Sequence, residues 1–256
     1  MSIHHPHAEV STGLTTLSKY PGRLLGSYRE ANSGCQFLYA RPADAPELWD
    51  AYLHGARQNY RRFGVEQVLE YETTRTGQST TFFVAVADHR GRVVAGVRVQ
   101  GPYRSVDQAH ALAEWAGRPG SVALRREIAA RADAPDGGVI ELKTGWVDSD
   151  APARRALTPA VARTAFHIFR LVGVRYALCT VADHAVRRWQ SSGAQVSADV
   201  TPVAYPDPRY RTVPIWWDRE TMLEKSDGAH LLLLADEQDQ FERSLSVDVS
   251  GALAAA

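Results

Sequence analysis

The sequence predicts an α+β fold in which a mixed, mostly antiparallel twisted sheet is flanked by helices. Two apolar runs joined by turn residues predict a hairpin over 80–100. A third apolar run at 139–147 is followed by an amphipathic stretch at 154–172 and a fourth apolar run at 174–181. A helix that connects two strands of one sheet in this way makes those strands parallel. We therefore expect one parallel pair within the sheet.

The elements before the hairpin are less regular. Residues 1–34 mix His, Thr, Ser, Gly and Pro without a sustained apolar period, which predicts a flexible N-terminal arm in front of one domain at 35–256. A short aromatic run at 35–40 predicts the first strand. A helix over 47–63 follows, because apolar residues recur near helical spacing with arginines between them.

The elements around the parallel pair are shorter. Two weaker helical segments, 109–115 and 122–131, separate the hairpin from the strand at 139–147. A short helix at 184–191 follows the strand at 174–181, and a segment rich in Tyr, Trp and Pro comes after it. No internal repeat and no long linker divides the chain, so we expect a single domain.

Composition excludes several classes of function. The chain has 29 basic and 29 acidic residues, so no overall field favours a nucleic-acid partner. Its two cysteines, Cys35 and Cys179, are too few for a disulfide framework or a thiolate zinc site, and we expect no metal. No apolar run approaches the roughly 20 residues of a membrane span. We expect a cytoplasmic protein without a membrane span.

The strand, loop and helix at 139–172 form the natural ligand site. A helix N-terminus offers unpaired N–H groups and the positive end of its dipole, and this helix would begin beside Arg154 and Arg155. Phosphate or pyrophosphate suits those groups. A pair of solvated arginines is the other interpretation of the same residues.

The run from 139 to 194 resembles the core of the GNAT acetyltransferases. The residues that match the family's last segment are Ala185, Val186 and Gly193, while Trp189 stands where the family has a tyrosine. The family's phosphate-binding loop contains spaced glycines, but 150–159 contains none. The acyl-homoserine-lactone synthases and the long-chain N-acyl amino acid synthases, a subgroup of this superfamily, share that departure.

Other parts of the chain also resemble this subgroup. Its characteristic elements correspond here to Tyr60-Arg61-Arg62-Phe63-Gly64, the hairpin with Gly96 and Arg98, Glu141, and the tail segment 202–210. The subgroup's glutamate is usually followed three residues later by an arginine, and Thr144 occupies that place here. The resemblance implies a GNAT-like sheet whose two parallel strands splay around the donor's pantetheine arm.

The resemblance also implies roles for individual residues. Glu141 would be the general base that takes a proton from an attacking amine. The residues implied in donor binding are Trp146, Val147, Arg154, Arg155 and Trp189. The residues implied in binding the acceptor substrate are Arg62, Phe63 and Arg98. Trp189 cannot protonate the leaving thiolate as a tyrosine would.

The same residues allow simpler interpretations. Glu141 could turn toward solvent beside Lys143, and Arg98 could be an outward residue of its strand. Cys179, near His184, could be read as a nucleophile, but an apolar strand favours a small buried side chain there.

We therefore expect an acyltransferase that moves a long-chain fatty acyl group to a small amine such as an amino acid. The donor would be acyl-CoA or an acyl carrier protein with its phosphopantetheine, and the missing glycines favour the carrier protein. That carrier would dock on the arginines of the helix at 47–63 or on Arg154 and Arg155. The alternative is a GNAT-fold module that has lost catalysis and binds an acyl or nucleotide ligand.

Overall fold

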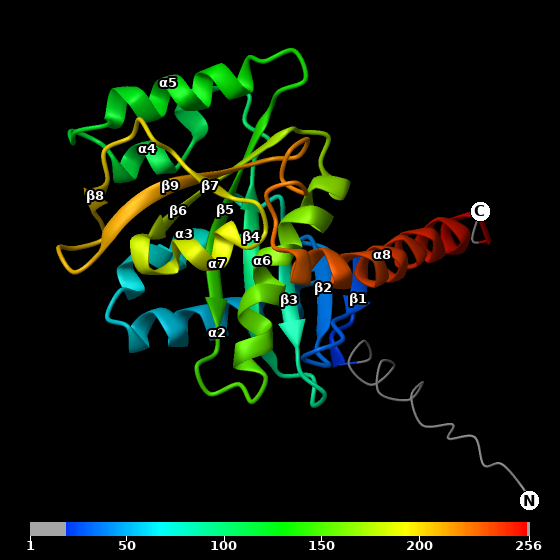
Figure 1. Cartoon of the computed structure of the whole chain (residues 1–256). Helices are drawn as coiled ribbons and strands as arrows, with labels where there is room; N and C mark the ends of the chain where they lie inside the picture. Colours follow the sequence, from blue (N-terminus) through cyan, green and yellow to red (C-terminus); the bar gives the residue numbers. More distant parts are fainter. Residues whose placement is uncertain (1–18, 255–256) are drawn as a thin grey trace, which may run out of the picture.

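The computed structural model describes residues 19–254, and these residues form one sheet covered by helices (Figure 1). The sheet has nine strands in the order β1-β2-β3-β4-β5-β6-β9-β7, and β8 pairs with β9. The strands are β1 (Leu24–Arg29), β2 (Gln36–Ala40), β3 (Phe82–Ala87), β4 (Val93–Gln100), β5 (Val139–Val147), β6 (Tyr176–Ala182), β7 (Gln195–Val196), β8 (Val203–Ala204) and β9 (Arg211–Asp218).

Helices cover both faces of this sheet. The α-helices are α2 (Pro46–Arg62), α3 (Tyr71–Thr74), α4 (Ala111–Glu114), α5 (Ser121–Ala132), α6 (Arg154–Leu171), α7 (Val186–Gln190) and α8 (Gly228–Ala254). The 3-10 helices are η1 (Glu66–Leu69), η2 (Val106–Gln108) and η3 (Asp183–Ala185). The described residues contain no helix with both the length and the apolar character needed to cross a membrane.

The predicted parallel pair is confirmed. β5 and β6 run parallel, α6 connects them, and every other strand pairing among the described residues is antiparallel. The parallel ladder joins only Val139–Glu141 to Tyr176–Leu178, although β5 continues to Val147 and β6 to Ala182. The two strands therefore separate beyond Glu141, as the resemblance implied.

Alternation along the strands divides the core between the two faces. In β2, Phe37 and Tyr39 pack in the core below α6 and α8, whereas Leu38 and Ala40 pack against α2. A third cluster joins α4 and α5 to β5, β6 and β9, and Figure 1 shows these two helices together at one end of the sheet. The face that carries α2 therefore also carries α4 and α5.

The prediction of a flexible arm over 1–34 is wrong for part of that range. Leu24–Arg29 forms β1, which pairs with β2 along its length, and buried Tyr28 stacks on Phe37 with ring centroids 4.9 Å apart. The segment reads Leu-Leu-Gly-Ser-Tyr-Arg, and its half-buried edge position leaves little apolar periodicity to detect. Residues 1–18 lie outside the described residues.

Helix α8, which the sequence analysis did not predict, packs along β1. Phe241 lies over Gly26, where a Cβ atom would come within 2.5 Å of its ring. Side chains of α8 also bond the backbone of the edge strand: Ser27 N–H donates to Ser244 Oγ at 2.8 Å, and Arg29 N–H donates to Gln240 Oε1 at 2.9 Å. The helix thus satisfies donors that an edge strand leaves free.

A buried ion cluster fixes α8 to the rest of the domain. Arg163 of α6 is 2% exposed and donates through both Nε and Nη2 to Glu237 of α8, the latter at 2.6 Å. The same guanidinium donates to Glu30, at the end of β1, at 2.8 Å. Two carboxylates and one guanidinium therefore join three elements that lie far apart in the sequence.

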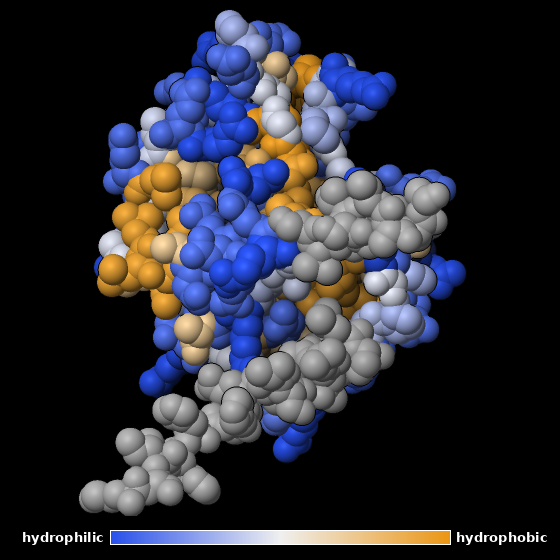
Figure 2. All heavy atoms as spheres, turned by 90° about the vertical axis from the view of Figure 1, so that its right-hand side faces the viewer, coloured by the Kyte–Doolittle hydropathy of each residue, from blue (hydrophilic) through white to orange (hydrophobic). Residues whose placement is uncertain are grey.

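The face toward which α8 extends mixes hydrophilic residues with hydrophobic patches (Figure 2). Large apolar side chains that are exposed in this part of the chain are Leu223, Leu231 and Leu232. Leu234 and Phe241 are buried against the core. The helix therefore carries apolar side chains on more than its docked side.

Candidate active site

A cavity of about 540 Å³ lies where β5 and β6 separate. It is lined by β5 from Leu142 to Val147 and by β6 from Cys179 to Ala182. Val161 and Ala162 line it from α6 on one face of the sheet, and Tyr60 lines it from α2 on the other. The cavity therefore lies between the two strands, with walls from elements on both faces of the sheet.

A distortion of β5 shapes one wall of this cavity. Thr144 has φ +51°, and the register with β4 shifts between Gly96 and Arg98. Tyr52 OH donates to the Thr144 carbonyl at 2.8 Å, and Arg98 Nε donates to Thr144 Oγ1 at 3.1 Å. These bonds hold β5 in a conformation that a non-glycine residue rarely adopts.

Arg98 is not an outward residue of its strand, because only 4% of it is exposed. Besides Thr144, its guanidinium bonds Thr80 Oγ1 at 3.4 Å, and it is absent from the cavity lining. Its cross-strand neighbour is Lys143. Arg98 supports the wall of the cavity from behind.

Glu141 does not turn toward solvent, because it is 0% exposed. Its Oε2 accepts a hydrogen bond from Tyr103 OH at 2.5 Å and another from the His110 backbone N–H at 2.9 Å. Its Oε1 lies 3.4 Å from Lys143 Nζ. Glu141 is not among the residues that line the cavity.

The carboxylate that faces the cavity belongs to Glu114, at the end of α4. Its Oε1 accepts from Lys143 Nζ at 2.6 Å and from Thr180 Oγ1 at 3.1 Å. Burial alone would raise the pKa of Glu114, but the Lys143 ammonium and the hydrogen bonds outweigh burial and lower it. Burial likewise opposes the charge of Lys143, yet the two carboxylates leave its pKa above the ordinary value. The two groups form a buried ion pair on the cavity wall.

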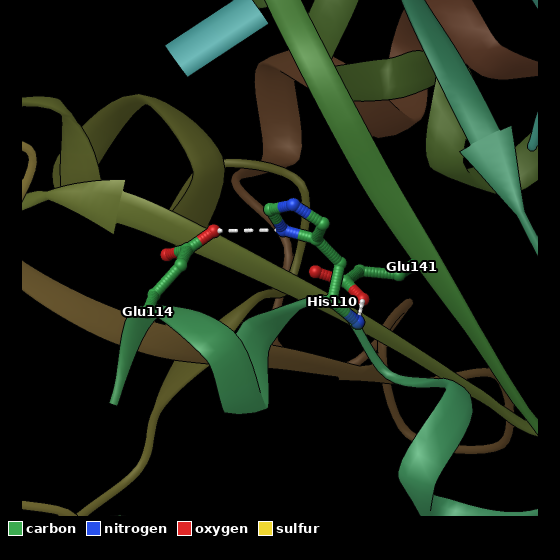
Figure 3. Close-up of side chains that lie close together, drawn as sticks. All are labelled: His110, Glu114 and Glu141. Atoms are coloured by element: carbon green, nitrogen blue, oxygen red, sulfur yellow. Dashed lines mark hydrogen bonds and ion pairs between the residues drawn. The ribbon is translucent and has the colours of Figure 1, made fainter. Parts of the chain in front are cut away.

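His110 lies between the two glutamates (Figure 3). Its backbone N–H bonds Glu141, and its Nδ1 lies 3.5 Å from Glu114 Oε1. Interaction with the adjacent Glu114 carboxylate raises the pKa of His110, although burial lowers it. Ligand atoms of His110, Glu114 and Glu141 all fall within 4.8 Å of one another, as in a metal site. The Lys143 ammonium already supplies positive charge to both carboxylates, so this donor set does not favour a metal ion.

Most of the predicted donor-binding residues meet at the cavity. Those that line it are Trp146, Val147, Arg154 and Trp189. Arg155 instead lines an adjoining hollow at the start of α6, together with Arg154 and Arg188. Arg154 and Arg188 also line the cavity itself, so the hollow and the cavity meet there.

The predicted acceptor-binding residues are dispersed. Phe63 lines the cavity. Arg62 is exposed and pairs with Asp150 at 2.9 Å and with Ser149. Arg98 is buried behind Thr144. The structure thus brings Phe63 to the cavity and places the two arginines elsewhere.

Sequence reasoning missed Glu114 and His110. Both lie in the segment that the sequence analysis described only as a short helix at 109–115. A charged residue between Ala-Leu-Ala and Trp-Ala is costly to bury without a partner, and a histidine four residues earlier can reach it on one helical face. The four-residue spacing of His110 and Glu114 was the feature of the sequence that could have indicated a paired, buried carboxylate.

Cys179 lines the cavity, but its environment predicts an unreactive thiol. Burial raises its pKa to about 12, and burial also raises the pKa of Cys35. Only the thiolate attacks disulfide reagents, so at pH 8 we expect Cys179 to react about 10³-fold more slowly than a free thiol. Absorbance after adding an aromatic disulfide reagent measures this. Both cysteines should react promptly in denaturant, and rapid labelling of native protein would contradict the prediction.

The mixed sheet with one splayed parallel pair and a crossover helix is a GNAT-like fold, and comparison with solved structures confirms it. No family model matches the sequence. The structure of FeeM, an N-acyl amino acid synthase from uncultured soil microbes, superposes with a TM-score of 0.53 at 10% identity, covering 75% of this chain and 94% of that one. At this identity the likeness shows a shared fold.

Curated sequences give a nearer relation. The chain is 41% identical over 215 residues to the uncharacterized protein Rv1356c of Mycobacterium tuberculosis, which covers 84% of this chain and 81% of the relative. It is equally similar to the uncharacterized protein Mb1391c of Mycobacterium bovis. The chain belongs to the family of these mycobacterial proteins.

Proposed function

We propose that the protein is an N-acyltransferase that moves a fatty acyl group from a thioester donor to a small amine such as an amino acid. The cavity between the splayed strands carries this proposal. Apolar side chains such as Val161 and Val181 line it, and the Glu114–Lys143 ion pair lies on its wall. The cavity can therefore hold a hydrophobic acyl chain next to the Glu114–Lys143 ion pair, which can act on the attacking amine.

The donor is an acyl-pantetheine thioester that enters beside the start of α6. Arg154 and Arg188 lie where the hollow and the cavity meet, and Arg155 lies next to them in the hollow. Guanidinium groups suit a phosphate or an acidic protein surface. Because the glycines of a close phosphate loop are missing, acyl carrier protein is the preferred donor and acyl-CoA the second.

The amine nitrogen attacks the thioester carbonyl carbon, and collapse of the tetrahedral intermediate breaks the C–S bond. A proton leaves the nitrogen for the Glu114 carboxylate, because Glu114 faces the cavity and Glu141 does not. The Lys143 ammonium stabilises the negative oxygen of the intermediate. A thiolate of ordinary pKa, about 8.5, leaves without an acid, so Trp189 need not donate a proton.

Glu141, which the resemblance implied as the base, has a positioning role in this scheme. It bonds the His110 backbone and lies 3.4 Å from Lys143, so it fixes the groups around Glu114.

Turnover with defined donors tests the function. Purified protein is mixed with a long-chain acyl-CoA or acyl carrier protein and a set of amino acids, while thiol release and the N-acyl product are measured by absorbance and mass spectrometry. We expect an amide product that retains the acyl chain. Ligand binding without product from either donor would instead support the inactive binding module.

Salt dependence tests the choice of donor. Exposed charges are screened over about 8 Å at physiological ionic strength, so rates with acyl carrier protein should fall as salt is added. Arg154→Met should raise KM for the carrier protein with little change in kcat. The matched control is Arg243→Met, a charge loss at an exposed position of α8. Equal, salt-insensitive efficiency with both donors would contradict carrier docking.

A further inference from the structure

Three side chains form a continuous line from the cavity to the protein surface. Glu114 is 2% exposed and lines the cavity, His110 is 22% exposed, and Glu70 is 55% exposed. His110 Nδ1 lies 3.5 Å from Glu114 Oε1, and His110 Nε2 lies 3.3 Å from Glu70 Oε1. The two ring nitrogens of one imidazole therefore face one buried and one exposed carboxylate.

The backbone holds each member of this line in place. The His110 N–H donates to buried Glu141, and Glu114 follows His110 by one helical turn. Glu70 has φ +46°, a left-handed conformation that a non-glycine residue seldom adopts. It joins η1 to α3 there and lines a separate surface hollow with Arg57 and Tyr71. A positive φ costs conformational energy at a non-glycine residue, and strain of this kind often occurs at functional positions. Here it accompanies the placement of the Glu70 carboxylate beside His110.

The other charged groups near His110 are accounted for. Lys143 bonds Glu114 and lies near Glu141, and its charge disfavours a protonated His110 ring while the two carboxylates favour it. Tyr103 OH is committed to Glu141. The Nδ1 atom of His110 makes no hydrogen bond to any described group within normal geometry, and Glu114 is its ionic neighbour. The ring is therefore available to exchange a proton with Glu114.

We propose that Glu114, His110 and Glu70 are a proton exit path for the acyl transfer, an inference that rests on the proposed function. Glu114 takes the amine proton and passes it to Nδ1 of the neutral His110 ring. The imidazolium then releases its Nε2 proton to Glu70 and on to water. Each transfer moves one proton between adjacent atoms and leaves Glu114 ionised, while His110 ends with its proton on Nδ1. A flip of the partly exposed ring then turns the unprotonated nitrogen back toward Glu114 for the next turnover.

The path predicts a defined pH dependence. His110 must be neutral to accept a proton, so turnover should rise with pH through the pKa of His110, which Glu114 raises above its ordinary value. Nuclear magnetic resonance titration of the His110 ring gives that pKa independently. In Glu114→Gln the charge that favours imidazolium is lost, so the pKa of His110 should move to lower pH.

Chemical rescue provides the decisive test. His110→Ala should lower kcat at low buffer concentration by about 10²-fold or more, the usual contribution of a positioned acid–base group. Added imidazole should restore turnover in a saturable manner, because the truncated position is partly exposed. Glu70→Gln should lower kcat in the same direction. The matched controls are His54→Ala on α2 and Glu72→Gln on α3, whose exposed side chains interact with Gln58 and Arg75 respectively.

The outcomes separate the path from the function. A folded His110→Ala variant with wild-type turnover, or with a loss that imidazole does not reduce, would overturn the path while wild-type turnover upholds the acyltransferase. Wild-type protein without turnover would overturn both. Rescue of His110→Ala together with a Glu70→Gln effect that Glu72→Gln lacks supports the path.

Discussion

Glu114→Gln is expected to lower kcat by about 10²- to 10⁴-fold with either donor, the usual contribution of a positioned general base. Glutamine keeps the shape of the side chain but cannot accept the amine proton. Donor KM should change little, because the arginines at the cavity mouth are untouched. Steady-state turnover and the thermal midpoint, measured on the same preparation, show whether the loss lies in chemistry or in folding.

Glu141→Gln separates the two carboxylates of the site. If Glu141 is the base that the resemblance implied, this variant should lose as much kcat as Glu114→Gln. If Glu141 only positions Lys143 and His110, its loss of kcat should be smaller and accompanied by a lower thermal midpoint. Glu127→Gln is a control, since Glu127 is a largely buried carboxylate that bonds Trp216 and Ser197 away from the cavity. Normal turnover in Glu114→Gln would refute its assignment as the base.

Arg163→Met is expected to reduce the free energy of unfolding by about 3–5 kcal/mol. Methionine fills the space but leaves Glu30 and Glu237 buried without the guanidinium that balances both. The loss is large because an uncompensated buried charge costs far more than the intact cluster contributes. Denaturant titration at neutral pH measures it.

Arg170→Met is the matched control for that experiment. Arg170 also reaches from α6 to α8, where it pairs with Glu242, but both side chains are more than half exposed. Exposed pairs contribute under about 1 kcal/mol, so stability should hardly change. Equal effects of the two substitutions would show that burial of the Arg163 cluster has no special weight.

The sequence predicted the centre of the sheet well for a physical reason. The hairpin and the strand–helix–strand unit carry their signal in short periodic segments, and the helix predicted over 154–172 is observed as Arg154–Leu171. By contrast, β1 is stabilised by Phe241 and by α8 side chains more than 200 residues away, so no local pattern reveals it.

The candidate site was only partly predictable for a related reason. Glu141 drew attention as a carboxylate in an apolar strand but does not line the cavity, whereas Trp146, Trp189 and Arg154 do. Which carboxylate faces the cavity depends on how α4 packs over β5 and β6, and this packing is not encoded near Glu141. The bulge at Thr144, which Arg98 supports, likewise depends on pairing with β4.

The hydrogen bonds between α8 and β1 also bear on how the protein behaves at high concentration. An exposed edge strand can pair with a strand of another molecule and so begin aggregation. Here Ser244 and Gln240 occupy backbone donors of β1 that such a strand would need. At the opposite end of the sheet β7 spans only Gln195–Val196, too short to template a long partner. Pairing with a strand of another molecule is thus disfavoured at both edges of the sheet. Helix α8 occupies backbone donors of β1, and β7 is too short to pair over any length.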